Sequence, residues 1–276
     1  MFPIFNTIEE GGRAAAGFVR RYRWMALGFF AAYFAAAAIG VSGIVRLPMP
    51  LWLASLLVTW GLGAVAMVAM APIWTALYRF AVLGDATRQY RQFDTRTLRV
   101  AGVMAVMSVI MLLGAVPFAL GLDILPRVGP RRLVVLGAVA FAFMVKLGSF
   151  WLNARLVIAP AMAAAGSRPQ ALDTSFVYTR WSSFKVLFTL LLVYFPLLSV
   201  SACFIAGNSI LEMIPGSPQD LAFATLNVVL TTALSATTDL VWGGVCGRMA
   251  LKLVKAHRAK AAEATRRAKE RRDEDD

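Results

Sequence analysis

The sequence is poor in the residues that build metal and redox sites. It has one histidine, His257, and two cysteines, Cys203 and Cys246, which both lie in apolar stretches. A single histidine cannot supply the several imidazoles of a zinc site or the paired ligands of some haems. The cysteines form no CxxC pair and no disulfide framework. No P-loop and no GxGxxG after a strand occurs. We therefore assign no catalytic residue, metal ligand or cofactor.

Acidic residues are also scarce: 15 Asp and Glu stand against 28 Lys and Arg, a formal charge of +13 over 276 residues. Such an excess could indicate nucleic-acid binding. However, 59% of the residues are hydrophobic, the mean hydropathy is +0.68, and the basic residues separate long apolar blocks. This distribution is typical of membrane topology, so we expect no nucleic-acid partner.

Six apolar stretches are long enough to cross a bilayer, which takes about 20 helical residues. They are Trp24–Val45, Leu51–Leu77, Val100–Leu122, Leu133–Asn153, Val186–Gly207 and Leu221–Val245. The first has a long polar lead, which favours an uncleaved helix over a signal peptide. The sequence thus predicts an all-α membrane protein with a cytoplasmic amphipathic lead (1–23), a six-helix membrane domain (24–253) and a basic cytoplasmic tail (254–276).

Proline and the apolar runs that outlast one bilayer thickness predict local departures from straight spans. Pro72, Pro117 and Pro196 should kink three helices, because each removes a backbone donor. The runs Leu77–Leu83 and Leu156–Ala165 should extend their helices to the membrane surface or fold along it.

The basic residues indicate the orientation. With six spans, 23 of the 28 Lys and Arg fall on the side that holds both termini, and four fall on the other. Positive residues are retained in the cytoplasm. We expect a multi-pass protein of the bacterial inner (plasma) membrane with cytoplasmic N- and C-termini.

The spans divide into three tandem hairpins, each introduced by a cytoplasmic segment. Residues Asp85–Arg99 and Gln170–Lys185 carry apolar stripes beside arginines, which suits helices in the headgroup region; ordinary interfacial loops fit equally well. Each even span has a Trp followed by an Arg: Trp74 and Arg79, Trp151 and Arg155, Trp242 and Arg248. These pairs suggest a parallel repeat, although Trp and Arg are common at any membrane interface.

Two charges lie inside the predicted spans. Lys146 precedes Arg155 by nine residues, and Asp239 precedes Arg248 by nine. If the interfacial arginines mark one depth, Lys146 and Asp239 are level, and we predict that they form an intramembrane ion pair. We favour a structural lock over a gated ion or proton site. Alternatively, Lys146 snorkels, and a protonated Asp239 bonds to Thr238 or Ser235.

Several other patterns bear on packing and binding. Gly243 and Gly247 form a GxxxG step, for which packing within the chain is favoured over homo-oligomerisation. The five methionines Met67, Met70, Met104, Met107 and Met111 could indicate soft-metal transport, but a plain apolar helix face is favoured. The segment Lys252–Arg272 is expected to contact anionic headgroups or a partner, or to be simply solvated.

The runs YRFAVLGD (78–85) and ARLVIAPAMA (154–163), followed by an amphipathic segment ending in YTR, carry a resemblance over Gly17–Leu253. They resemble bacterial inner-membrane proteins of the YciC-like group and the membrane domain that precedes some glycerophosphodiester phosphodiesterases. The resemblance implies a six-helix membrane domain and brings no catalytic residues. This chain has no soluble phosphodiesterase domain, so that activity is not carried over.

The favoured function is a non-enzymatic structural or accessory component that acts through lipid or membrane-protein contacts. The alternative is a transporter or permease subunit with a polar path between hairpins, and an enzyme comes third. The polar residues inside the spans discriminate between them, because transporters need convergent polar groups near mid-membrane. The candidates are Thr59, Asn227, Ser235, Thr237 and Thr238.

Overall fold

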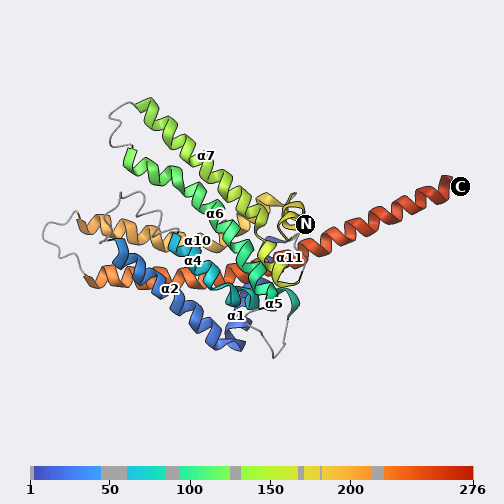
Figure 1. Ribbon diagram of the computed structural model, residues 1–276, viewed down its shortest axis with the longest axis horizontal. Coiled ribbons are helices and arrows are strands. Elements are labelled where there is room, and N and C mark those ends of the chain that lie inside the picture. The colour runs from blue at the N-terminus through green and yellow to red at the C-terminus, as the bar shows by residue number, and fades with distance from the viewer. Residues whose placement is uncertain are drawn as a thin grey trace.

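The computed structural model describes residues 3–44, 61–84, 94–124, 132–166, 171–180, 182–212 and 221–275. These residues are almost entirely helical, with no strand among them (Figure 1). The helices are α1 (Ile4–Arg21), α2 (Arg23–Ile44), α4 (Leu62–Ala69), α5 (Ala71–Leu83), α6 (Thr95–Ile124), α7 (Arg132–Leu156), α8 (Ala159–Ala164), α9 (Ala171–Thr179), α10 (Ser183–Glu212) and α11 (Leu221–Asp275). The predicted all-α class is confirmed.

Four helical segments are long and apolar enough to cross a membrane: Thr95–Pro117, Val135–Ala164, Ser183–Val200 and Thr225–Arg267. A fifth span results if α1 and α2, which meet at 105°, count as one. Of the predicted second span, residues 51–60 lie outside the described part of the chain, and the rest forms α4 and the beginning of α5. Large apolar side chains such as Phe141 and Phe143 of α7 point outward, as expected when lipid rather than water is the solvent. The protein is membrane-embedded.

Prolines act differently at the three predicted kinks. Before Pro72 the chain breaks at Met70 into α4 and α5, and Pro72 occupies the first turn of α5, where no backbone donor is needed. Pro117 and Pro196 instead lie inside α6 and α10, which continue past them.

The segment after α7 is buried among other helices. The chain turns at Val157 and Ile158, and all six residues of α8 are buried. Helix α8 packs against α5, α6, α9 and α11. The expectation that Leu156–Ala165 extends its helix to the membrane surface or folds along it stays a prediction, and the structure adds that the segment is covered by other helices. Four alanines in α8 allow neighbouring helices to approach closely, which turns the segment into core.

Helix α9 lies within the predicted interfacial segment Gln170–Lys185. Its buried residues are Ala171, Ser175 and Thr179, at helical spacing. Two aromatic side chains of this segment are more exposed, Phe176 at 37% and Phe184 at 88%. The face that packs on the protein is thus the small and hydroxyl-bearing one. Of the other predicted interfacial segment, residues 85–93 lie outside the described part, and α6 begins at Thr95.

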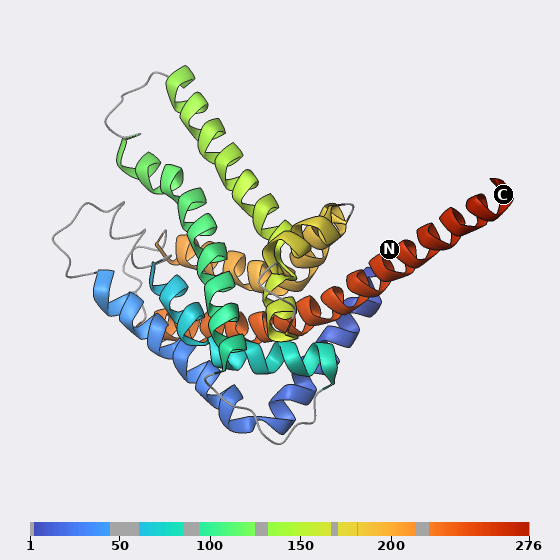
Figure 2. The same cartoon turned by 45° about the vertical axis from the view of Figure 1, so that its right-hand side comes forward.

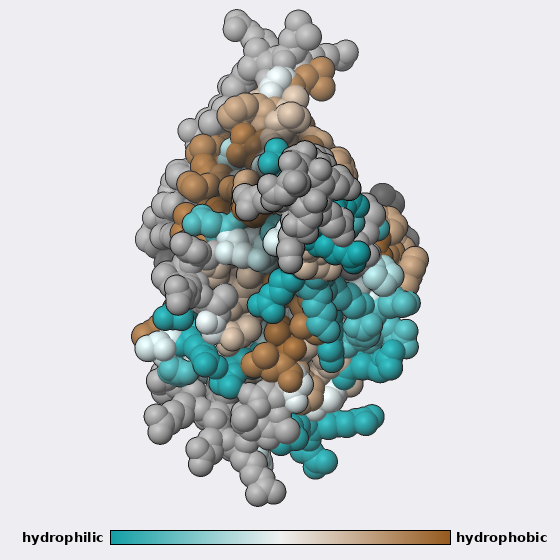
Figure 3. All heavy atoms as spheres, turned by 90° about the vertical axis from the view of Figure 1, so that its right-hand side faces the viewer, coloured by the Kyte–Doolittle hydropathy of each residue, from teal (hydrophilic) through white to brown (hydrophobic). Residues whose placement is uncertain are grey.

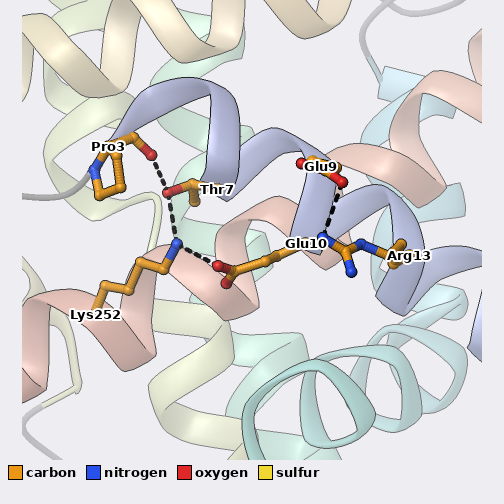
Figure 4. A network of polar contacts seen from close by, with 6 residues as sticks. All are labelled: Pro3, Thr7, Glu9, Glu10, Arg13 and Lys252. Carbon is orange, nitrogen blue, oxygen red and sulfur yellow. Dashed lines mark hydrogen bonds and ion pairs between the residues drawn. The ribbon is translucent and has the colours of Figure 1, made fainter.

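The amphipathic lead is a helix anchored to α11 (Figure 4). The Lys252 ammonium lies 2.9 Å from Glu10 Oε1 and donates to the Thr7 hydroxyl at 3.2 Å. The helices also touch backbone to backbone: a Cβ added at Gly244 would lie 2.3 Å from the carbonyl oxygen of Gly11. Glycine at both positions permits this crossing.

Helix α11 runs continuously for 55 residues and extends past the other helices (Figures 1 and 2). It crosses the predicted boundary between membrane domain and tail without a break. The GxxxG step packs within the chain, as expected: an added Cβ at Gly243 would meet Leu77 at 2.6 Å, and one at Gly247 would meet Ala81 at 2.5 Å. Hydrophilic side chains gather at the end from which α11 projects (Figure 3).

Candidate binding cavity within the helix bundle

A cavity of about 400 Å³ lies between the helices. Residues of α2, α4, α5, α6, α7, α8, α10 and α11 line it, so most of the fold contributes to its wall. Its lining is mainly apolar and aromatic, with the carboxylate of Asp239 as its charged group. This combination of an apolar wall and a few polar groups is typical of small-molecule sites.

Three helices converge at Asp239. Its Oδ2 accepts a hydrogen bond from the hydroxyl of Tyr33 on α2, and its Oδ1 accepts one from the hydroxyl of Tyr194 on α10. Because a hydroxyl bond to a carboxylate is charge-assisted, these bonds are stronger than those between neutral groups. The two tyrosines hold the Asp239 side chain in one orientation at the cavity wall.

Aromatic rings form much of the remaining wall. Trp74 stacks on Tyr78 with ring centroids 5.8 Å apart, and Phe29 packs behind it at 5.2 Å from Trp74. On the other side, Tyr194 meets the ring of Trp242 at 6.1 Å. Aromatic rings from α5, α10 and α11 therefore line the cavity that holds the Asp239 side chain.

The indole of Trp74 also presents a donor. Trp74 is 2% exposed and lines the cavity, and its Nε1–H has no hydrogen-bond acceptor among the described residues. Buried donors are normally paired, because desolvating one without compensation is costly. An acceptor on a bound molecule would satisfy it.

The five methionines singled out in the sequence all line this cavity: Met67, Met70, Met104, Met107 and Met111. They come from α4, α6 and the turn before α5. The interpretation as a plain apolar helix face missed this convergence. Unbranched thioether side chains adapt to irregular ligands, so their position here favours binding over simple packing.

Lys146 and Asp239 have different surroundings. Lys146 lies on the face of α7 that packs on α6: its Cδ is 3.8 Å from an added Cβ at Gly114, and its ammonium is 5.2 Å from the Phe150 ring centroid. Asp239 faces α2 and α10, and no ion pair among the described residues includes it. The ion pair of Lys146 with Asp239 stays a prediction.

Charge exchange tests that pairing. If the pair forms in the membrane, Lys146→Asp combined with Asp239→Lys should accumulate better than either single variant. If the tyrosines alone hold Asp239, the double variant should accumulate no better than Asp239→Lys.

Arg155, one of the three predicted interfacial arginines, is buried and contacts α9. Its guanidinium donates to the carbonyl of Phe176 on α9 and stacks 3.9 Å from the ring centroid of that residue. Its own carbonyl accepts the hydroxyls of Ser175 at 2.9 Å and Thr179 at 2.8 Å. Arg155 thus docks α9 on the end of α7. Arg79 lies on α5 and Arg248 on α11, and their common depth stays a prediction.

The polar residues that were candidates for a path between the hairpins are not found in the cavity wall. Thr59 is outside the described part; Asn227, Ser235, Thr237 and Thr238 are not among the lining residues. Ser108 and Asn153 line it instead. Tyr33 and Tyr194, the hydrogen-bond partners of Asp239, were not predicted from the sequence. Each of these tyrosines lies within a predicted apolar span, and the spans hold one predicted carboxylate. A polar hydroxyl in such a span was the feature of the sequence that could have identified them.

The fold and this cavity define the class of protein: a polytopic α-helical membrane protein with an internal, carboxylate-bearing cavity. No family model, curated protein or solved structure matches the chain.

Proposed function

We propose that this protein binds a small amphiphilic molecule within the membrane, as a transporter or permease subunit does. The cavity beside Asp239 is the observation that carries the proposal. Its volume falls within the range of about 300–1,000 Å³ of known ligand pockets, and a carboxylate inside a span usually marks a functional site. This inverts the preference drawn from sequence, where the transporter was the alternative.

Filling the cavity tests the proposal. Ser108 lines the cavity on α6, whereas its neighbour Val109 is 53% exposed on the outside of the helix. Ser108→Trp should exclude the ligand because the indole occupies its space, and Val109→Trp should not. The measurement is mass spectrometry of the molecules that co-purify with each protein, per mole of protein.

We expect wild type and Val109→Trp to retain a component that Ser108→Trp lacks. The same complement in all three proteins would contradict a ligand in the cavity.

The topology belongs to the same proposal: six spans in three tandem hairpins across a bacterial inner membrane, with both termini cytoplasmic. The 23-to-4 distribution of basic residues supports it. So does the arrangement of the bundle, since α1 is anchored to the part of α11 that leads out of its hydrophilic end (Figures 2 and 3).

Reporter fusions test this topology. Fusions after Arg88, Lys185 and the C-terminus should report cytoplasm, because those connections carry the retained positive charge. Fusions near Arg127 and Gly216 should report the opposite compartment. A single inverted hairpin would contradict both the orientation and the parallel repeat.

The relationship to the YciC-like group is part of this proposal as well. The two runs that suggested it supply Tyr78, Val157 and Pro160 to the cavity wall. If the relationship holds, the shared feature is the cavity rather than a catalytic site.

An accessory role through lipid or protein contacts is the second candidate. The projecting end of α11 favours it (Figure 1), because Arg258, Lys260 and Arg267 of this helix are exposed. Anionic headgroups or an acidic membrane-protein partner fit this surface. A partner that co-purifies with Ser108→Trp but is lost on deleting residues 258–276 would favour the accessory role.

A further inference from the structure

We propose that the cavity selects an organic cation: an ammonium-type group carried on an apolar body and bound between the Asp239 carboxylate and the surrounding aromatic rings. This inference rests on the proposed function, since it names the class of molecule that the cavity binds.

The acidic side chain of Asp239 favours a ligand with a positive charge. The hydroxyls of Tyr33 and Tyr194 each donate to a different oxygen of Asp239, so both oxygens of this side chain act as acceptors. A charge at this depth costs roughly 3 kcal/mol or more unless it is compensated. No ion pair among the described residues includes Asp239. A cation entering the cavity would supply the compensating charge.

The aromatic lining of the cavity also favours a cation. Five aromatic side chains line the same cavity: Tyr33, Trp74, Tyr78, Tyr194 and Trp242. Aromatic faces attract cations through the ring quadrupole, most strongly for tryptophan and most of all in a desolvated site. A carboxylate that shares its cavity with such rings favours a weakly hydrated organic cation over a small, strongly hydrated one.

The volume of the cavity favours an organic cation over a small ion. A water molecule takes up about 30 Å³, so a bare metal ion or ammonium would leave most of the 400 Å³ cavity empty. The five lining methionines offer flexible apolar contacts. These methionines would contact the apolar part of the ligand, while the Asp239 carboxylate and the aromatic rings would contact its ammonium group. Direct coordination of a soft metal by these thioethers is the competing possibility.

Two probes of one shape separate charge from fit. Benzyltrimethylammonium carries a quaternary nitrogen, and neopentylbenzene has carbon at that position and no charge. Binding of radiolabelled benzyltrimethylammonium is measured on the full chain in phosphatidylglycerol nanodiscs, with neopentylbenzene as competitor. We expect saturable binding of the cation, and neopentylbenzene should compete at least tenfold more weakly.

Variants assign that selectivity to the cavity. Asp239→Asn should weaken cation binding at least tenfold and leave neopentylbenzene binding unchanged. Glu263→Gln removes a carboxylate that is 59% exposed on the same helix, and it should bind like wild type. If Asp239→Asn fails to accumulate, the comparison of the two probes on wild type still decides the question.

Other outcomes distinguish the source of the cation and the failure of each proposal. Weaker probe binding in phosphatidylethanolamine nanodiscs than in phosphatidylglycerol nanodiscs would identify a lipid ammonium as the occupant; equal binding would indicate a soluble cation. Equal competition by neopentylbenzene, no saturable binding, or binding of Ag⁺ in place of the cation would overturn the inference. The proposed function would survive these results if Ser108→Trp still lost a co-purifying molecule, and would fail if it did not.

Discussion

Gly11→Ala is expected to loosen α1 from α11 and to reduce the free energy of unfolding by about 1–3 kcal/mol, the usual cost of overpacking. A Cβ at this position would lie 2.6 Å from both the Cα and the backbone nitrogen of Val245. Backbone atoms cannot rotate away as a side chain can, so the two helices must move apart. The midpoint of thermal unfolding, followed by size-exclusion chromatography of heated samples, measures the loss.

The neighbouring glycine provides the matched control. An added Cβ at Gly12 has no other atom within 4 Å. Gly12→Ala should therefore be neutral, or stabilising by up to about 1 kcal/mol, because alanine has the higher helix propensity. Equal thermal midpoints for the two variants would show that α1 does not cross α11 at Gly11.

Arg155→Met is expected to destabilise the protein by about 2–3 kcal/mol and to release α9 from α7. Arg155 is only 6% exposed, and its guanidinium both satisfies the Phe176 carbonyl and stacks on the Phe176 ring. Methionine fills similar space but cannot donate, so a charge-assisted bond is lost and a carbonyl is left without this donor. Hydrogen exchange of residues 171–180 measures the release, and the thermal midpoint measures the stability.

Two further substitutions separate docking from charge. Arg155→Lys keeps the charge but lacks the planar fork, so an intermediate loss is expected. Arg267→Met breaks an exposed pair with Glu263 on α11 and should change stability by less than about 1 kcal/mol. Faster exchange of α9 in Arg267→Met than in Arg155→Met would contradict the docking role.

The sequence by itself was sufficient to predict the elements that depend on local composition. The ranges Val100–Leu122, Leu133–Asn153 and Val186–Gly207 all fall within single helices, α6, α7 and α10. A long apolar run forms a helix in lipid whatever its neighbours, because its backbone groups must be satisfied within the segment. Packing of the Gly243 and Gly247 step was also predictable, since small residues at this spacing permit close helix contact.

Only the tertiary structure decided how the helices face one another. Tyr33 and Tyr194 are 206 and 45 residues from Asp239 in the chain, and hydropathy does not specify which face of a span meets which neighbour. The inward turn of α8 was equally unpredictable, since an apolar run after a span suits membrane, surface or core alike. Helix packing brings α2, α10 and α11 together so that two hydroxyls donate to one carboxylate at the cavity wall.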